Sequence, residues 1–314
     1  MILQEFPDLG WLKSQIAQRF RQRKGYNNVP LDTAGFPSVV IHTKVKEAYR
    51  PDIEGPVSIF MNLAGSSYCQ VEGRTVSIPE DYYFISNRSQ HYSLTIESKQ
   101  PVETFNIHFG EHFSEGVLGG LITATDSMLD NGTQQHGRAV TFHNRLYKKG
   151  DQFNRLVAAM LQLNTGKEFD KLLFEELLEG LLRHLFLQHR DILTAMDKLP
   201  SLKRSVKVEL FKRLSFAADY IHSNQHLQID LSELASTACL SKFHFLRLFK
   251  LVYGHSPHQY IQQLRLEKAI RLLGDSSLPV GTIAELVGFE NSQSFSRLFH
   301  QRMGLYPSQF RQSK

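Results

Sequence analysis

Two arginines near the C-terminus of this 314-residue chain occupy the same place in a repeated pattern. Arg247 lies in F-x-R-L-F-x4-G-x2-P-x2-Y at residues 245–260, and Arg297 lies in F-x-R-L-F-x4-G-x2-P-x2-F at residues 295–310. A guanidinium group can donate paired hydrogen bonds to a phosphate or to O6 and N7 of guanine. The repeat therefore predicts two similar nucleic-acid contacts, and a solvated arginine or an internal salt bridge is the alternative at each position.

The repeat extends upstream, which predicts one helix–turn–helix unit built twice. Ala238-Cys239-Leu240 corresponds to Val287-Gly288-Phe289, and each triplet is a predicted turn. In the first copy Asp230 and Glu233 predict a capping box, and Ser241 predicts the cap of a helix over Lys242–Tyr253. Positive φ is expected at the turn glycine of the second copy. Gly254 and Gly304 are predicted to end the second helix of each unit.

The second helix of each unit has one apolar face and one polar, basic face. Phe245, Leu248, Phe249 and Val252 follow i, i+3, i+4, i+7 spacing, and Phe295, Leu298 and Phe299 repeat most of that stripe. Two helices of this kind joined by a tight turn form the arrangement that enters a DNA major groove. A helical repeat used only for packing is the alternative. A periodic segment over 257–273 predicts a connecting helix about 25 Å long, which suits two reading helices about 34 Å apart.

Residues from about 207 to 312 resemble the DNA-binding domain of the AraC/XylS family of bacterial transcription regulators. The second copy reads I-A-E-L-V-G-F-E-N-S-Q-S-F-S-R-L-F and then G-L-Y-P-S-Q-F-R, ending at Arg311. The family implies contacts with two adjacent major-groove segments. Leu246 departs from the family, which often has a base-reading polar residue there. This departure argues against a hydrogen bond to a base at that position and leaves contact with a thymine methyl open. The resemblance implies these DNA-binding residues: Lys242, Phe243, His244, Leu246, Arg247, Lys250, Ser292, Gln293, Ser296 and Arg297.

Charge is unevenly distributed along the chain. Residues 201–314 hold 15 Lys and Arg against 8 Asp and Glu, whereas the remaining residues hold 21 against 23. A basic C-terminal region is consistent with a polyanionic partner. The N-terminal sequence lacks the pattern of a signal peptide, and no apolar run approaches a membrane span. The two cysteines, Cys69 and Cys239, lie in different predicted domains, so we do not expect a disulfide framework. We expect the reducing environment of the cytoplasm instead.

The N-terminal region has short alternating runs typical of strands. Seven strands are predicted between Phe36 and Phe109, which favours a small β-barrel or jelly roll. The stretch 73–87, followed by His91, resembles the cupin-like sensor of AraC-family regulators, over about residues 36–110. A barrel can hold one small ligand in its mouth. The effector-binding candidates, chosen by residue type alone, are Tyr68, Tyr82, Tyr83 and His91.

Four histidines in this region raise the question of a metal-dependent cupin. They are His42, His91, His108 and His112. The H-x-H cluster with a following glutamate that metal cupins carry is absent, so no metal ligand, cofactor or catalytic residue is predicted. Histidines that lie on the surface or form hydrogen bonds are the favoured interpretation.

Two helical stretches, 153–163 and 169–189, separate the regions, and both have broad apolar faces. Burial against the barrel and a dimer interface are the two interpretations. Residues 191–205 form the predicted linker. The basic run Arg19, Arg21, Arg23 and Lys24 is interpreted as a solvated helix face, with a DNA-contacting arm as the alternative.

The sequence thus predicts an α+β protein: a cupin-like β-barrel with flanking helices, then an all-α domain with two helix–turn–helix units. The expected domains are 1–145 for effector sensing, 146–190 for dimerisation or packing, 191–205 as linker and 206–314 for DNA binding. We expect a cytoplasmic, homodimeric, effector-controlled transcription regulator that binds promoter DNA and RNA polymerase, not an enzyme or a membrane protein. A cupin enzyme fused to a DNA-binding domain and an architectural DNA-binding protein are the alternatives.

Overall fold

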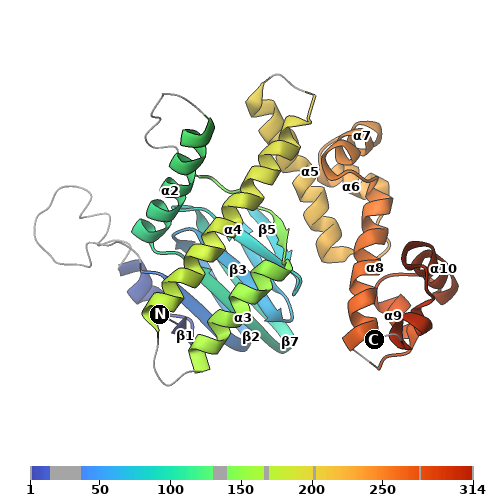
Figure 1. Ribbon diagram of the computed structural model, residues 1–314, viewed down its shortest axis with the longest axis horizontal. Helices are drawn as coiled ribbons and strands as arrows, with labels where there is room; N and C mark the ends of the chain where they lie inside the picture. The colour runs from blue at the N-terminus through green and yellow to red at the C-terminus, as the bar shows by residue number, and fades with distance from the viewer. Residues whose placement is uncertain are drawn as a thin grey trace, which may run out of the picture. The chain divides into compact units, whose positions relative to one another are not determined.

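The computed structural model describes residues 2–14, 37–129, 140–165, 170–200, 203–275 and 277–312 (Figure 1). The chain divides into two compact units, Met1–Ile192 and Leu193–Lys314. The basic run at 19–24 lies outside the described residues. Within the described ranges, no helix has the length and apolar character needed to cross a membrane.

The first unit is built around one eight-stranded sheet. β2 and β7 are long partners that run antiparallel, and β7 also pairs with β3 and with β4. The pairing path is β1-β2-β7-β3-β6-β8, and β4 with β5 branches from β7. The strands are β1 (Ile2–Leu3), β2 (Val39–Glu54), β3 (Ser58–Ala64), β4 (Ser67–Val71), β5 (Arg74–Ile78), β6 (Tyr82–Ser86), β7 (His91–His108) and β8 (Leu146–Lys148).

The α+β class and the strand-rich first unit are confirmed, but two details of the prediction were wrong. The sixth and seventh predicted strands are one strand, β7, whose register with β2 shifts between Glu97 and Val102. The polar residues of that irregularity had suggested a turn. The described strands also leave the sheet open, because β5 pairs only with β4 and β8 only with β6. The sheet of the described strands is therefore not a closed barrel.

The interior of the first unit is filled by apolar side chains. β-strand residues supply most of this cluster, and Leu12 from the N-terminal segment joins it. Phe60 and Tyr92 lie with ring centroids 4.7 Å apart inside it. Alternating positions on paired strands therefore form a packed core.

Helices pack on the other side of the sheet. α3 (Asp151–Thr165) and α4 (Lys171–Asp197) lie across it in Figure 1, and α2 (Glu111–Leu129) follows β7. The Phe153 ring of α3 stacks on the Tyr83 ring of β6 at 4.3 Å, and α4 buries Leu178, Leu181 and Leu182 completely. The broad apolar faces predicted for these helices are thus largely buried within their own unit.

The second unit is all-helical and contains the predicted double helix–turn–helix. α8 runs between the two helix pairs, α6–α7 and α9–α10 (Figure 1). The helices are α5 (Arg204–Asn224), α6 (Leu231–Thr237), α7 (Lys242–Tyr253), α8 (Pro257–Asp275), α9 (Val280–Leu286), α10 (Ser292–Met303) and α11 (Pro307–Gln312). α5 was not predicted, although Phe211, Leu214, Ala218 and Ile221 give it a buried stripe at helical spacing.

The predicted linker, 191–205, begins inside α4 and ends inside α5. α4 continues to Asp197, and Ile192 and Met196 extend its buried stripe. The division into units falls within α4, between Ile192 and Leu193. The four domain boundaries given above stay a prediction.

Candidate nucleic-acid interface

The first helix pair, α6–α7, is joined by a turn whose geometry is set at both ends. Ser241 accepts a hydrogen bond from the backbone N–H of His244 at 3.4 Å and begins α7 as predicted. Gly254 ends α7 at φ 77°, where its N–H donates to the carbonyl of Lys250. Cys239, in the turn itself, also has positive φ, 50°.

The N-cap predicted for α6 is confirmed at Asp230, but the predicted capping-box partner was wrong. Asp230 lies at the N-cap position without a side-chain cap hydrogen bond. Glu233 instead accepts a hydrogen bond from the hydroxyl of Tyr220 on α5, and this bond raises the pKa of that tyrosine. Glu233 therefore bonds to a tertiary partner, Tyr220, that the local sequence pattern did not reveal.

The second helix pair, α9–α10, repeats the arrangement with a stronger cap. Asn291 accepts a hydrogen bond from the N–H of Ser294 at 2.8 Å, and Gly304 ends α10 at φ 73°. The turn glycine, Gly288, has φ 96° as predicted. A Cβ at this position would lie 2.8 Å from the carbonyl oxygen of His226, so the close approach of two backbones requires glycine here.

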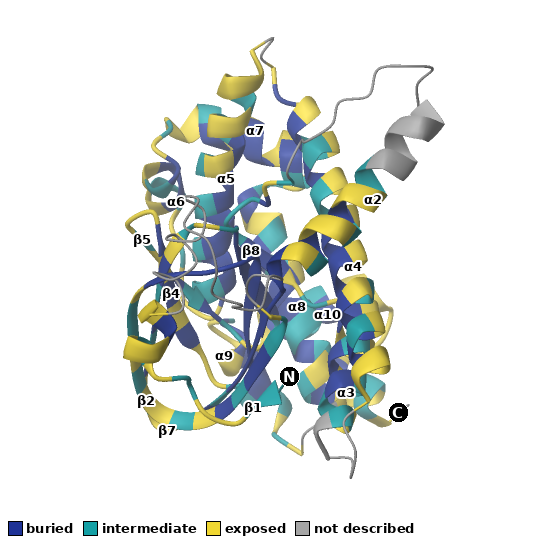
Figure 2. Cartoon of the chain, turned by 90° about the vertical axis from the view of Figure 1, so that its left-hand side faces the viewer, coloured by how far each residue is buried: buried dark blue, intermediate teal, exposed yellow. Residues whose placement is uncertain are grey.

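Each second helix buries one stripe and exposes the opposite one; for α7 the buried and exposed residues are blue and yellow in Figure 2. On α7 the buried residues are Phe245, Leu248, Phe249 and Val252, and on α10 they are Phe295 and Phe299. Positions two residues earlier lie about 200° around a helix from these, since each residue turns it by about 100°. The outer stripe is Phe243, Leu246, Arg247 and Lys250 on α7, and Gln293, Ser296, Arg297 and His300 on α10.

The structure places all ten predicted DNA-binding residues off the buried faces. His244 and Ser296 are partly buried, and the other eight are exposed. Among the described residues, neither Arg247 nor Arg297 has an ion-pair partner, which removes the internal salt bridge offered as the alternative. Whether these ten side chains contact DNA stays a prediction.

A buried arginine, which the sequence analysis missed, holds the second helix pair in place. Arg265 on α8 donates from Nε to the carbonyl of Gln225 and from Nη2 to that of Leu227, each at 2.7 Å. Its guanidinium also lies 5.7 Å from the ring centre of Phe289, in the second turn. The Arg265 guanidinium provides hydrogen-bond donors to the carbonyl groups that follow the C-terminal end of α5, where a positive charge is favourable. Burial lowers the pKa of Arg265. Its position in the sequence pattern of α8 did not distinguish it from an arginine on the surface.

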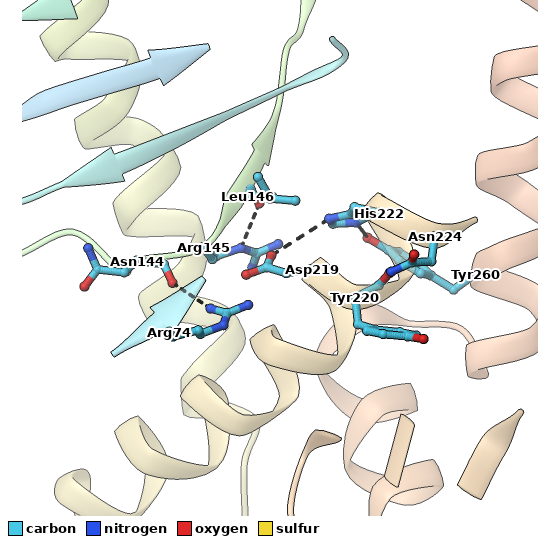
Figure 3. Close-up of polar contacts among 9 residues, drawn as sticks. All are labelled: Arg74, Asn144, Arg145, Leu146, Asp219, Tyr220, His222, Asn224 and Tyr260. Carbon is cyan, nitrogen blue, oxygen red and sulfur yellow. Dashed lines mark hydrogen bonds and ion pairs between the residues drawn. The ribbon is translucent and has the colours of Figure 1, made fainter. Parts of the chain in front are cut away.

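A polar chain joins α5 to α8 beside the first helix pair (Figure 3). His222 Nε2 and the Tyr260 hydroxyl are 2.8 Å apart, and His222 Nδ1 lies 4.0 Å from Asp219 Oδ1. The Tyr260 ring meets the Phe249 ring edge-on at 5.5 Å. This tyrosine is the last residue of the first repeated pattern, and it therefore links the core of that pair to α5.

The effector-binding candidates do not come together. Tyr82 points into the packed core of the first unit, and Tyr83, its neighbour, stacks on the opposite side against Tyr147 and Phe153. Tyr68 is exposed, and His91 is an exposed partner of Asp52 at 2.7 Å. As an alternating strand requires, only one of the two adjacent tyrosines faces the interior. These four residues stay candidates by type, without a shared site.

The four histidines considered as metal ligands each have their own polar neighbour. His42 Nε2 lies 3.0 Å from Glu103, and His108 Nδ1 lies 2.8 Å from the Ser58 hydroxyl. Burial lowers the pKa of His108 to about 4. In the part of the chain that the structure describes, no three His, Cys, Asp or Glu side chains form a group that could hold a metal ion.

Two arginines of the first unit bond to backbone carbonyls near β8. In the first unit, Arg74 Nη1 donates to the carbonyl of Asn144 at 3.4 Å and Arg145 Nε to that of Leu146 at 3.2 Å (Figure 3). The Arg74 bond joins the segment before β8 to the edge strand β5, and the Arg145 bond lies at the start of β8.

Comparisons with known proteins agree with the geometry of the second unit. Residues 234–313 match a family model described as a helix-turn-helix domain. The chain is 36% identical over 146 residues to the MmsAB operon regulatory protein of Pseudomonas aeruginosa, covering 44% of this chain and 46% of that protein. It is 31% identical over 93 residues to the multiple antibiotic resistance protein MarA of Salmonella typhimurium, covering 30% of this chain and 73% of MarA.

A wider but weaker likeness extends into the first unit. The chain is 25% identical over 238 residues to the HTH-type transcriptional regulator YisR of Bacillus subtilis, covering 74% of this chain and 76% of YisR. By contrast, the match spans less than half the length of the MmsAB operon regulatory protein. The best-supported likeness is therefore to the second unit.

Proposed function

The chain belongs to the AraC/XylS family of transcription regulators, and we propose that it regulates transcription by binding specific double-stranded promoter DNA through α7 and α10. Its second unit supplies both reading helices on one scaffold. α8 is about 28 Å long at 1.5 Å per residue, a length that can hold two reading helices in successive major grooves about 34 Å apart.

The observation that carries this proposal is the pair Arg247 and Arg297. Both are exposed at equivalent places on the two outer stripes. Arg265 and Arg311 of the same unit, in contrast, donate to backbone carbonyls, with Arg311 Nη2 2.6 Å from the oxygen of Leu278. Arg265 and Arg311 thus serve the fold, whereas Arg247 and Arg297 remain available to a phosphate or a guanine.

The test is fluorescence anisotropy of the full chain on DNA enriched from a randomised duplex library, at several salt concentrations. Arg247→Ala and Arg297→Ala are each expected to weaken specific binding by about 1–3 kcal/mol if the arginine contacts a base. A phosphate contact would instead lower the salt dependence by about one unit of slope. Arg302→Ala removes an exposed charge from another face of α10 and is the matched control.

Each possible result has a distinct meaning. Loss of DNA affinity in both arginine variants, with the affinity of the Arg302 variant unchanged, supports reading by the two helices. Unchanged affinity in both variants, with intact folding by circular dichroism, overturns the proposed interface. Failure of the full chain to enrich any sequence overturns sequence-specific binding itself.

The first unit is the proposed sensor of a small organic effector. It has a separate sheet and core, and it lacks the excess of positive charge seen in the second unit. An effector that favours one DNA-binding state by about 1–3 kcal/mol would change DNA affinity roughly 5–150-fold. Titration of the full chain and of residues 201–314, with and without a low-molecular-weight cell extract, tests the assignment. A fragment that keeps the response would place the sensor in the second unit.

Self-association and polymerase contact complete the proposal. The leucines Leu172, Leu173 and Leu187 on α4 remain exposed beside its buried stripe, and they favour a homodimer through this helix. Leu187→Glu should then shift the mass measured by sedimentation from dimer to monomer. RNA polymerase in the cytoplasm is the expected partner of the DNA-bound protein, and pull-down with purified polymerase tests it.

A further inference from the structure

The two outer stripes have different chemistry at equivalent positions. Phe243 and Leu246 on α7 correspond to Gln293 and Ser296 on α10, while an arginine follows at the same place in both. Phe243 is 79% exposed and Leu246 is 36% exposed, so both present apolar surface to the solvent. Two apolar side chains thus face outward where the second pair presents two side chains that form hydrogen bonds.

This apolar pair lies in a positively charged surround. Arg247 and Lys250 share its stripe, and Lys242 precedes it at the start of α7; all three are exposed. The surface would attract a polyanion while offering that polyanion an apolar contact at its centre. The residues near the N-terminal end of a reading helix are those that meet base edges. Thymine is the base whose major-groove edge carries a methyl group.

We propose that α7 reads thymine methyl groups through Phe243 and Leu246, whereas α10 reads its part of the site by hydrogen bonds. This inference rests on the proposed DNA-binding function and adds the base chemistry that each helix recognises. The partner surface is a T-containing major-groove segment, held in place by phosphate contacts from the flanking cations. Specificity in this segment then depends on apolar contact with a single exocyclic methyl group.

Uracil substitution tests the inference, because dU differs from dT only by that methyl. The full chain is titrated on its enriched site and on versions with each dT replaced singly by dU. At the thymines read by α7, affinity is expected to fall about fourfold per methyl removed, the change given by burial of one such group. The remaining thymines of the site should be insensitive.

Two double variants assign the effect to a helix. Phe243→Gln with Leu246→Ser gives α7 the residues of α10 and should bind dT and dU sites equally. Gln293→Ala with Ser296→Ala is the matched change on α10, and it should keep the uracil sensitivity. Both pairs are solvent-facing, so circular dichroism and urea midpoints should stay close to those of the unchanged chain.

The possible results distinguish a failure of this inference from a failure of the proposed DNA-binding function. An enriched site that is indifferent to uracil at every position overturns methyl reading while leaving DNA binding intact. Uracil sensitivity that persists in the α7 double variant assigns the methyl contact to other residues and also overturns it. Failure to enrich any DNA overturns the proposed function, and this inference with it.

Discussion

The two helix pairs share a sequence pattern, yet their turns have different surroundings. Cys239 and Gly288 both have positive φ, 50° and 96°, at corresponding places. Cys239 is exposed, whereas the backbone at Gly288 packs against the carbonyl oxygens of Gln225 and His226. The repeated pattern thus sets the local turn, but the neighbouring backbone decides whether a side chain fits there.

The pairs also differ in how their aromatic cores end. The first pattern ends in Tyr260, whose hydroxyl bonds to His222 of α5. The second ends in Phe310, whose ring meets Phe299 edge-on at 5.6 Å. The first core is therefore anchored to a side chain within α5, whereas Arg265 anchors the second turn to backbone carbonyls just after the end of α5.

The largest expected effect tests what the pairs have in common. Phe249 and Phe299 are completely buried at equivalent positions. Each Phe→Ala change should destabilise the second unit by about 3–5 kcal/mol, from lost burial and the cavity left behind. Urea melts of residues 203–312 measure it. Wild-type midpoints would mean that the rings are not core residues, and a loss in one variant alone would break the equivalence.

The second effect tests the difference between the turns. Gly288→Ala should destabilise by about 2–3 kcal/mol, because the new Cβ meets backbone oxygens and φ remains unfavourable. Cys239→Gly should be neutral or stabilising by up to about 1 kcal/mol, since glycine adopts positive φ without steric cost. The same urea melts report both. Equal losses would show that the two turns are under one constraint.

A third change makes the first core resemble the second. Tyr260→Phe removes the hydroxyl partner of His222, which is buried, and should cost about 1–2 kcal/mol. Tyr306→Phe is the control, because this tyrosine is about half exposed. An unchanged midpoint for Tyr260→Phe would mean that water replaces the lost contact and that the polar anchor does not matter.

Local patterns were enough to predict the two helix pairs of the second unit, but neither α5 nor the tertiary contacts. The caps at Ser241, Gly254 and Gly304 follow from residue type and neighbours, so the sequence predicted them. The partners of Glu233 and Arg265 lie 13 and 40 or 38 residues away in the chain, and spacing within one helix contains no information about them. These distant contacts are where the capping box was wrong and the buried arginine was missed.

The first unit was harder to predict because its pairing is non-local. The alternating strand pattern identified most strands, yet a single irregularity in β7 between Glu97 and Val102 was interpreted as a turn. Strand order and closure depend on partners distant in sequence, such as Val71 with Tyr92. The effector candidates were chosen by residue type, and type does not determine which residues share a cavity.

The smallest expected effect concerns the caps of the two reading helices. Asn291 accepts from the N–H of Ser294 at 2.8 Å, but Ser241 accepts from that of His244 at 3.4 Å. Asparagine and serine are about equal as caps, so hydrogen-bond length should decide the order. Asn291→Ala should cost about 1 kcal/mol and Ser241→Ala about 0.5 kcal/mol in the free energy of unfolding.

Substitution to glycine at each cap separates the hydrogen bond from the backbone preference, because glycine is itself a tolerated cap and should cost only a few tenths of a kcal/mol. Urea melts of the four variants, with amide exchange at Ser294 and His244 as a local readout, measure both contributions. Faster exchange at Ser294 in Asn291→Ala, with a smaller change at His244 in Ser241→Ala, is expected. The reverse order would mean that α7 depends more on its cap than α10 does, although the cap hydrogen bond of α7 is the longer of the two. Hydrogen-bond length would then not determine the contribution of each cap.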